Sequence, residues 1–180
     1  PYGTAYRALI QCCGARSGET MLVHGASGAV GTAALQIAAG LGLTTIGTAG
    51  RARGLELVAE HGAAHVLDHT QPGYLNAVAD ITGGDGPDII LEMLANVNLA
   101  EDMAIAAPFG RIGIIGSRGA VEINPREAMM KDLSIIAMAL PNTPAEAMAE
   151  IHAALGRGLT DGSLNPVIGQ ELPLAEAIEA

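Results

Sequence analysis

Aromatic side chains, positive charge and cysteine are all scarce in this chain of 180 residues. It has no Trp, one Phe and three Tyr, so aromatic residues make up 2% of the sequence. Because 49% of the residues are nevertheless apolar, we expect a core of Ala, Val, Ile, Leu and Met in thin, closely packed layers. This composition excludes disorder and a disulfide scaffold, and the length favours one domain.

The scarcity of positive charge disfavours nucleic acid as a partner. The chain has 9 basic and 19 acidic residues, a formal net charge of −10, and Lys131 is its single lysine. Such a field repels polyanions. Any phosphate must therefore be held locally, by backbone N–H groups, a helix N-terminus or one or two arginines.

The two cysteines indicate a reducing compartment. Cys12 and Cys13 are adjacent, and neighbouring residues rarely meet the geometry of a disulfide. No stretch approaches the roughly 18 apolar residues of a membrane span. We expect a cytoplasmic protein with no membrane partner.

Short apolar runs alternate with helical patterns from Met21 onward, which is typical of βα units around a parallel sheet. Each run is continuous rather than alternating in polarity, as in strands covered on both faces. The expected strands are 21–24, 44–48, 65–68, 88–93, 111–115 and 134–140. The sequence therefore predicts an α/β fold: a Rossmann-type, doubly wound, six-stranded parallel sheet with helices on both faces.

Helices are expected between these strands and at both ends of the chain. The clearest follows the first strand, where an apolar stripe recurs at helical spacing between Val30 and Leu41. The others are predicted over 1–13, 54–61, 74–82, 98–107 and 145–155. Because the chain stops part-way into a helical pattern at 175–180, we expect residues 1–180 to be one domain of a longer protein.

The turn between the first strand and its helix has the spacing of a dinucleotide-binding fingerprint. It reads Gly25-Ala26-Ser27-Gly28-Ala29-Val30-Gly31, with Ala26 in place of the first glycine. Gly28 would let the backbone approach a pyrophosphate, and the N–H groups of Ala29 and Val30 would point at its oxygens. The alternative interpretation is a tight turn with a purely structural role.

Two other nucleotide-binding patterns are absent. A P-loop needs Lys directly after its last glycine, but Thr32 follows Gly31. A short-chain reductase needs Tyr with Lys four residues later, and no tyrosine here has that partner.

The end of the second strand favours NADP over NAD. NAD-binding proteins place an acid there to bind the ribose hydroxyls, but the first acid after this strand is Glu56, inside the next helix. Arg51 and Arg53 stand instead where a 2′-phosphate would lie. Alternatively, both arginines are solvated charges at a helix start.

Two groups of residues have weaker functional interpretations. His61, His65 and His69 are spaced four apart, but the expected strand breaks any shared helical face, which disfavours a metal site. We interpret His69 as a donor beside the adenosine of a cofactor and His24 as a packed core histidine. The loop 110–119 suits either the nicotinamide half of a cofactor or a simple turn.

Several motifs together resemble one known family. They are Thr4-Ala5-Tyr6-Arg7-Ala8-Leu9, Val23-His24-Gly25-Ala26-Ser27-Gly28, Gly47-Thr48-Ala49-Gly50, Glu92-Met93-Leu94-Ala95-Asn96-Val97-Asn98, Gly116-Ser117-Arg118-Gly119 and Glu122-Ile123-Asn124-Pro125-Arg126. In this order, and over nearly the whole chain, the sequence resembles the cofactor domain of zeta-crystallin-like NADPH quinone oxidoreductases. These form a branch of the medium-chain dehydrogenase/reductase superfamily.

The resemblance implies a set of cofactor-binding residues. It assigns Ser27, Gly28, Ala29 and Val30 to the pyrophosphate, Gly50 and His69 to the adenosine and 2′-phosphate end, and Asn98, Ile115, Gly116, Ser117, Arg118, Met138, Ala139 and Leu140 to the nicotinamide side. Ala29 replaces a glycine that is frequent in the family loop. Arg51 and Arg53 are not fixed family positions, so their role rests on the argument above.

The resemblance also implies an activity. The expected function is the NADP(H)-binding domain of a zinc-free reductase that passes reducing equivalents from NADPH to a quinone or similar acceptor. No residue here is a convincing catalytic acid or base, and no metal is expected. An enoyl or alkenal reductase of the same superfamily and a non-catalytic, crystallin-like NADPH-binding protein are the alternatives. A homodimer through the terminal strand 134–140 is expected.

Overall fold

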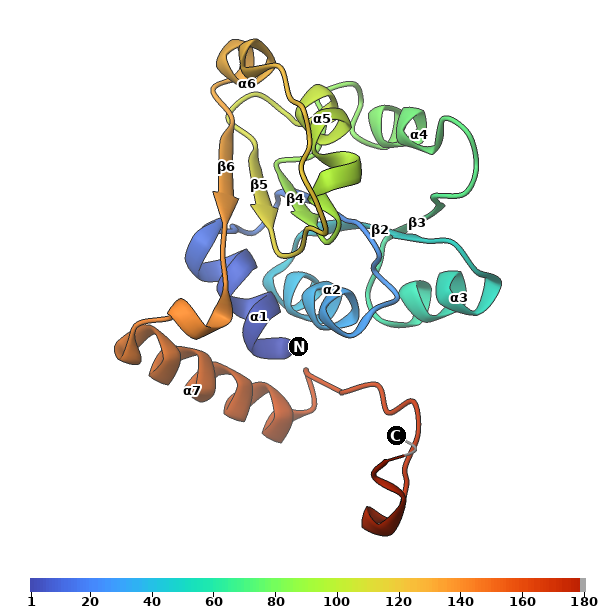
Figure 1. The fold of residues 1–180 in the computed structure, drawn as a ribbon, viewed down its shortest axis with the longest axis vertical. Coiled ribbons are helices and arrows are strands. Elements are labelled where there is room, and N and C mark those ends of the chain that lie inside the picture. The colour runs from blue at the N-terminus through green and yellow to red at the C-terminus, as the bar shows by residue number, and fades with distance from the viewer. Residues whose placement is uncertain (179–180) are drawn as a thin grey trace.

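The computed structural model describes residues 1–178 as a single parallel sheet flanked by helices (Figure 1). The strands are β1 (Thr20–Val23), β2 (Thr44–Ala49), β3 (His65–Asp68), β4 (Ile89–Glu92), β5 (Arg111–Ile114) and β6 (Ser134–Ala137). The helices are α1 (Tyr2–Tyr6), α2 (Ala29–Leu41), α3 (Ala52–Glu60), α4 (Tyr74–Ile81), α5 (Ala95–Ile105), α6 (Pro125–Lys131) and α7 (Ala145–Asp161), with a π-helical segment η1 (Arg7–Cys12) and 3₁₀ turns η2 (Leu140–Asn142) and η3 (Leu174–Glu176).

The strand order is β3-β2-β1-β4-β5-β6, and every neighbouring pair is parallel. The chain winds outward from β1 in one direction and then, from β4, in the other. The predicted fold class is thereby confirmed. In such a sheet the order reverses between β1 and β4, and ligands bind where the carboxyl ends of these strands diverge.

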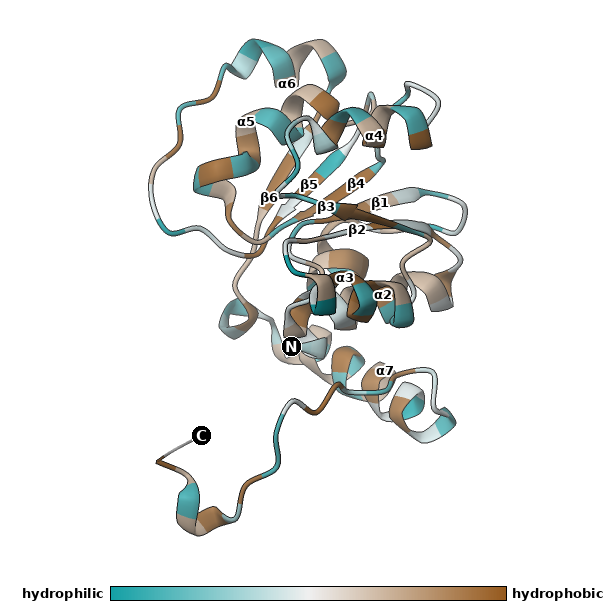
Figure 2. Cartoon of the chain, turned by 90° about the vertical axis from the view of Figure 1, so that its right-hand side faces the viewer, coloured by the Kyte–Doolittle hydropathy of each residue, from teal (hydrophilic) through white to brown (hydrophobic). Residues whose placement is uncertain are grey.

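Two apolar cores cover the two faces of the sheet. Helices α1, α2 and α3 lie on one face, and α4, α5 and α6 on the other (Figures 1 and 2). In β1, Met21 and Val23 enter the first core while Leu22 enters the second. The segment 89–91 of β4 alternates in the same way. Continuous apolar runs therefore arise in these central strands because both of their faces are covered.

The sixth strand is shorter than the sequence suggested. It ends at Ala137, and Leu140 begins the 3₁₀ turn η2 instead of continuing the strand. Pro141 follows in this turn, and proline has no N–H with which to continue a ladder. The expectation of a strand over 134–140 was wrong for its last three residues.

Helix boundaries also differ from those expected. The helix α6 was not predicted; Asn124 caps it, its side-chain oxygen accepting from the Arg126 amide at 3.1 Å. The helix α5 begins at Ala95 rather than Asn98, and α7 continues to Asp161. Of the pattern at 175–180, the structure has only the turn η3, and residues 179–180 lie outside the described residues.

The single lysine has a structural role. Lys131 Nζ donates to the carbonyl oxygens of Ala104 at 2.6 Å, Ala106 at 2.9 Å and Met103 at 3.3 Å. These carbonyls lie at the C-terminal end of α5, where backbone acceptors lack intrahelical partners and a positive charge is favourable. Lys131 thereby joins α6 to α5.

Glycine at position 31 lets α2 approach β1 closely. A Cβ atom added to Gly31 would lie 2.5 Å from Ala26 Cα and 2.7 Å from the Ala26 carbonyl carbon. Both neighbours are backbone atoms of the turn that joins β1 to α2, so no side-chain movement relieves the overlap. A side chain at residue 31 would push the helix N-terminus away from the strand end.

We therefore predict that Gly31→Ala lowers the free energy of unfolding by about 1–3 kcal/mol, through overpacking. The matched control is Gly40→Ala in the same helix, where nothing lies within 4 Å of an added Cβ atom. That control should raise stability by about 0.5–1 kcal/mol, because alanine loses less backbone entropy than glycine. Urea unfolding measures both. Equal stability of Gly31→Ala and the wild type would contradict the packing argument.

Candidate functional site

The Gly-rich turn presents free backbone donors at the carboxyl end of β1. Gly28 is the extended N-cap of α2, and the first intrahelical hydrogen bond runs from the Thr32 amide to the Gly28 carbonyl at 2.9 Å. The amides of Ala29 and Val30 lie in the turn before that bond, where a helix leaves N–H groups without intrahelical partners. Ala29 is exposed and Val30 partly exposed. This arrangement is suited to an anion such as a pyrophosphate.

A pocket of about 530 Å³ adjoins this turn at the carboxyl ends of β2 and β3. It is lined by Ser27, Gly50, Arg51, Arg53, Gly54, Leu57, His69 and Thr70. A Cβ atom at Gly50 would lie 2.5 Å from His69 Nε2, so glycine keeps this pocket open. Both arginines are exposed, and neither forms an ion pair with any residue in 1–178. The structure thus brings together the residues predicted for the adenosine and 2′-phosphate end.

A second pocket of about 430 Å³ shares His69 with the first. It is lined by His24, Gly25, His69, Tyr74, Met93, Leu94, Val97, Asn98 and Glu101. The Tyr74 ring lies edge-on to both histidine rings, with centroid distances of 6.5 Å. Asn98 therefore shares a pocket with His69, although the resemblance grouped it with the nicotinamide-side residues.

The remaining predicted residues follow β5 and β6. The loop after β5 is tied to α5, since the Ala95 amide donates to the Gly116 carbonyl at 2.9 Å and the Arg118 amide donates to Asn96 Oδ1 at 2.8 Å. Ser117 Oγ donates to the Gly119 carbonyl at 3.0 Å. Ile115 is partly exposed in this loop.

The segment after β6 divides into two parts. Just beyond the end of β6, the Met138 amide donates to the Ile114 carbonyl at 3.2 Å, and Ala139 is exposed. Leu140 lies in η2, where its side chain contacts α1: a Cβ atom at Gly3 would lie 3.6 Å from Leu140 Cδ2. Leu140 thus packs against the first helix.

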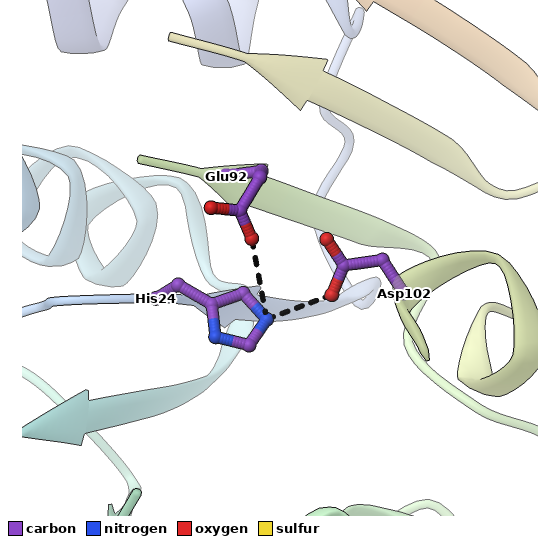
Figure 3. Close-up of side chains that lie close together, drawn as sticks. All are labelled: His24, Glu92 and Asp102. Carbon is purple, nitrogen blue, oxygen red and sulfur yellow. Dashed lines mark hydrogen bonds and ion pairs between the residues drawn. The ribbon is translucent and has the colours of Figure 1, made fainter. Parts of the chain in front are cut away.

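A buried polar cluster lies beneath the second pocket, at the ends of β1 and β4 (Figure 3). His24 Nε2 lies 2.8 Å from Asp102 Oδ1 and 3.7 Å from Glu92 Oε2. Asp102 and Glu92 are fully buried, and Asp102 Oδ2 has no hydrogen-bond partner in the described residues. The Glu92 carboxyl accepts from the Leu94 amide and from Asn98 Nδ2.

Burial and the neighbouring charges shift the pKa values of this cluster. Burial raises the pKa of Glu92 to about 7, even though His24 acts to lower it. For His24, burial lowers the pKa, but the hydrogen bond and charge of Asp102 outweigh burial and raise it. Burial also raises the pKa of Tyr74 to about 12. The cluster therefore favours the protonated form of His24, whereas Glu92 is close to the midpoint of its titration at neutral pH.

Sequence reasoning missed this cluster. It identified His24 as a packed core residue, which is correct for its burial, but gave it no charged partner. His24 and Asp102 lie 78 residues apart, so no local spacing connects them. The available signal was one acid, Glu92, at the end of an apolar run. His61, His65 and His69 lie at the end of α3, at the start of β3 and just after β3.

Comparisons with known proteins give the family. A profile described as "Zinc-binding dehydrogenase" matches residues 29–155. The chain belongs to the zinc-binding dehydrogenase family. Human quinone oxidoreductase is 47% identical over 180 residues, which cover 100% of this chain and 55% of that protein. The resemblance drawn from the motifs is confirmed, and the chain spans about half the length of the curated relatives it matches.

Solved structures of other oxidoreductases share the fold. A structure named NAD-dependent alcohol dehydrogenase has a TM-score of 0.86 and 30% identity, covering 99% of this chain and 51% of its own. Escherichia coli quinone oxidoreductase complexed with NADPH has a TM-score of 0.83 and 23% identity, covering 93% of this chain and 53% of its own. At 23% identity, the similarity to the Escherichia coli structure shows a shared fold and nothing further.

The family is described as zinc-binding, but the described residues do not provide a fitting zinc site. The one group of three ligand-type side chains that gathers in residues 1–178 is His24, Glu92 and Asp102, which are engaged with one another and with Asn98. Burial raises the pKa of Cys13 to about 12, so its thiol is a poor source of a metal-binding thiolate.

We predict that the stability of this dehydrogenase domain falls as pH rises from about 5 to about 8, in part because of Glu92. Its folded pKa of about 7 lies above the ordinary glutamate value of 4.5. Between these two values the folded state therefore binds more protons than the unfolded state. The stabilisation that comes from Glu92 is complete below pH 4.5 and is lost as the pH rises through about 7. Glu92→Gln should remove a slope of up to about 1.4 kcal/mol per pH unit.

Urea unfolding across this pH range measures the effect. Glu122→Gln is the matched control, because it removes a carboxyl group from an exposed position. The free energy of unfolding of this control should fall with pH as steeply as that of the wild type. Parallel wild-type and Glu92→Gln curves would show that Glu92 does not take up a proton on folding.

Proposed function

We propose that this chain is the NADP(H)-binding domain of a two-domain, zinc-free quinone oxidoreductase, which passes reducing equivalents from NADPH to a quinone or a related electron-poor acceptor. The observation that carries the proposal is the pocket that joins Ser27 of the Gly-rich turn to Arg51, Arg53 and His69. The 47% identity to human quinone oxidoreductase supports the choice of acceptor.

The pyrophosphate is proposed to bind at Ser27, Gly28, Ala29 and Val30. The free amides of the first turn of α2 supply donors, and the positive end of the helix dipole favours an anion. A larger side chain at Gly28 would approach the Gly25 carbonyl, which lies 3.3 Å from an added Cβ atom. Alanine at position 29 keeps the N–H group that this interaction needs.

The 2′-phosphate is proposed to bind at Arg51 and Arg53, beside Gly50 and His69. Guanidinium groups suit phosphate because they offer two parallel donors. The arginines have no acidic partner in the described residues, so their charges are available to a ligand. The adenosine then lies near His69, between the two pockets that share this residue.

The nicotinamide half is proposed to extend toward the ends of β5 and β6. It would be lined by Ile115, Gly116, Ser117, Arg118, Met138 and Ala139, with Leu140 supporting the segment from α1. When bound, the nicotinamide supplies the hydride. The residues of this chain orient it, and enclosure of the acceptor falls to the catalytic domain of the full protein.

Steady-state assays of the full two-domain protein test this function. We expect it to oxidise NADPH with a benzoquinone faster than with an α,β-unsaturated ketone, and to prefer NADPH over NADH at least about tenfold in kcat/KM, or about 1.4 kcal/mol. Arg51→Ala combined with Arg53→Ala should reduce this preference toward one, with little change in kcat/KM for NADH. Arg126→Ala removes an exposed arginine from α6 and is the control.

The other outcomes are informative. Faster reduction of the unsaturated ketone would identify an enoyl or alkenal reductase. Binding of NADPH without turnover of any acceptor would identify a non-catalytic, crystallin-like protein. A cofactor preference that survives loss of both arginines would exclude them as the 2′-phosphate site.

We also propose a homodimer formed through β6, which is an edge strand. The Ser134 amide donates to the Gly110 carbonyl, just before β5, at 2.9 Å, and the Met138 amide donates to the Ile114 carbonyl at the end of β5 at 3.2 Å. Alternation along a strand directs the amides of Ile135 and Ala137 outward, where a second copy of β6 would pair with them. Ile135 is 37% exposed, so pairing would also cover apolar surface.

Light scattering at micromolar concentration tests the dimer. The wild type should be a dimer, and Ala137→Pro a monomer, because proline removes an outward N–H group without breaking a bond to β5. Ala137→Val keeps that N–H group and should remain a dimer. A monomeric wild type would contradict the proposal.

A cytoplasmic location is proposed from the thiols. Both cysteines are free, and Cys13 is buried in the apolar core. Disulfides are rare in reducing compartments, which agrees with this pattern. In the described part of the chain, no helix is long and apolar enough to cross a membrane.

A further inference from the structure

Glu92 holds the side-chain amide of Asn98 in one orientation. Asn98 Nδ2 lies 3.2 Å from Glu92 Oε1 and 3.1 Å from Oε2. A carboxylate only accepts hydrogen bonds, so the atom that faces it must be the amide nitrogen. Above its pKa of about 7 Glu92 is ionised, so both of its oxygens accept, and Oε1 also accepts from the Leu94 amide.

Glu92 itself has little freedom to move. Its side chain is fully buried at the end of β4, and its carboxyl group is held by the Leu94 amide on one side and lies near His24 on the other (Figure 3). His24 is in turn hydrogen-bonded to Asp102 on α5, the helix that carries Asn98. The cluster therefore joins β1, β4 and α5 at one point.

Because its amide is oriented by Glu92, Asn98 presents a hydrogen-bond acceptor, Oδ1, at a fixed position in the second pocket. With Nδ2 turned to Glu92, the amide presents Oδ1 on its other side. Asn98 lines the pocket that also contains His69 and Tyr74, and no residue in 1–178 donates a hydrogen bond to Oδ1. A ligand group that donates is favoured at this position, and one that accepts is disfavoured.

The connectivity of NADPH indicates which ligand group meets Asn98. The adenine base and the 2′-phosphate are carried by adjacent carbons of one ribose. If the phosphate occupies the first pocket with Arg51 and Arg53, the base enters a pocket that adjoins it. The second pocket adjoins it through His69. The donor on the adenine edge is its 6-amino group.

We propose that Glu92 is a positioning residue that orients Asn98 so that Oδ1 accepts a hydrogen bond from the 6-amino group of adenine, making the pair a determinant of base specificity. The inference rests on the proposed NADP(H) function. It gives a role to a buried acid that the hydride transfer itself does not use. His24 and Asp102 support Glu92 from beneath.

The test compares NADPH with its deamino analogue, in which hypoxanthine replaces adenine and a carbonyl acceptor replaces the 6-amino donor. Calorimetric titration of the full-length wild type, at a pH above the Glu92 pKa of about 7, should give at least about tenfold tighter binding of NADPH than of the analogue. In Glu92→Gln, the new side-chain amide can donate to Asn98 Oδ1 and turn Nδ2 toward the pocket. The ratio of the affinity for NADPH to that for the analogue should then fall to one or below. Asn98→Ala should bring it to about one.

Glu122→Gln removes a carboxyl group at an exposed site outside both pockets and should keep the wild-type ratio. A wild-type ratio near one, or a tenfold ratio that survives Glu92→Gln, would overturn the proposal. If Glu92→Gln fails to fold, Asn98→Ala decides: a preserved ratio in that variant also overturns it. Failure of the wild type to bind NADPH at all would instead refute the proposed function.

Discussion

The contact between Gly31 and the backbone of Ala26 sets the position of α2, and the proposed cofactor site depends on that position. With only hydrogen on the Cα atom of residue 31, the helix begins directly against the end of β1. The free amides of its first turn are thereby brought to the carboxyl edge of the sheet, where β1 and β4 diverge. A displaced helix would move these donors away from the pocket lined by Ser27 and Arg51.

Electrostatics in this chain operates at short range. The net charge of −10 opposes any anionic ligand at a distance, so a phosphorylated cofactor must be held by local groups. The helix N-terminus and the two arginines, which have no ion-pair partner among residues 1–178, are such groups, and they lie around one pocket. Local charge pairing also operates in the interior, where the buried side chains of His24, at the end of β1, and Asp102, on α5, form an ion pair at 2.8 Å. Removing one partner would leave an uncompensated buried charge, which is strongly destabilising.

The sequence predicted the sheet well because its central strands are covered on both faces. Burial on both sides requires a continuous apolar run, as at 89–91 in β4, and such runs are visible in one dimension. The helix α6 was missed because none of its residues is buried, so it carries no apolar stripe at helical spacing. The end of β6 was placed too late because apolar residues continue to Leu140, although these no longer form a strand and Leu140 packs on α1.

The sequence by itself determined the fold class, the Gly-rich turn and the arginines at the end of β2, because each depends on residues close together in the chain. Only the tertiary structure decided that His24, Glu92 and Asp102 meet, and that Asn98 shares a pocket with His69. These residues come from separate βα units, and the order in which parallel strands assemble brings their ends to one edge. Sequence spacing contains no record of that order, whereas burial in the assembled sheet fixes both the contacts and the pKa values that follow from them.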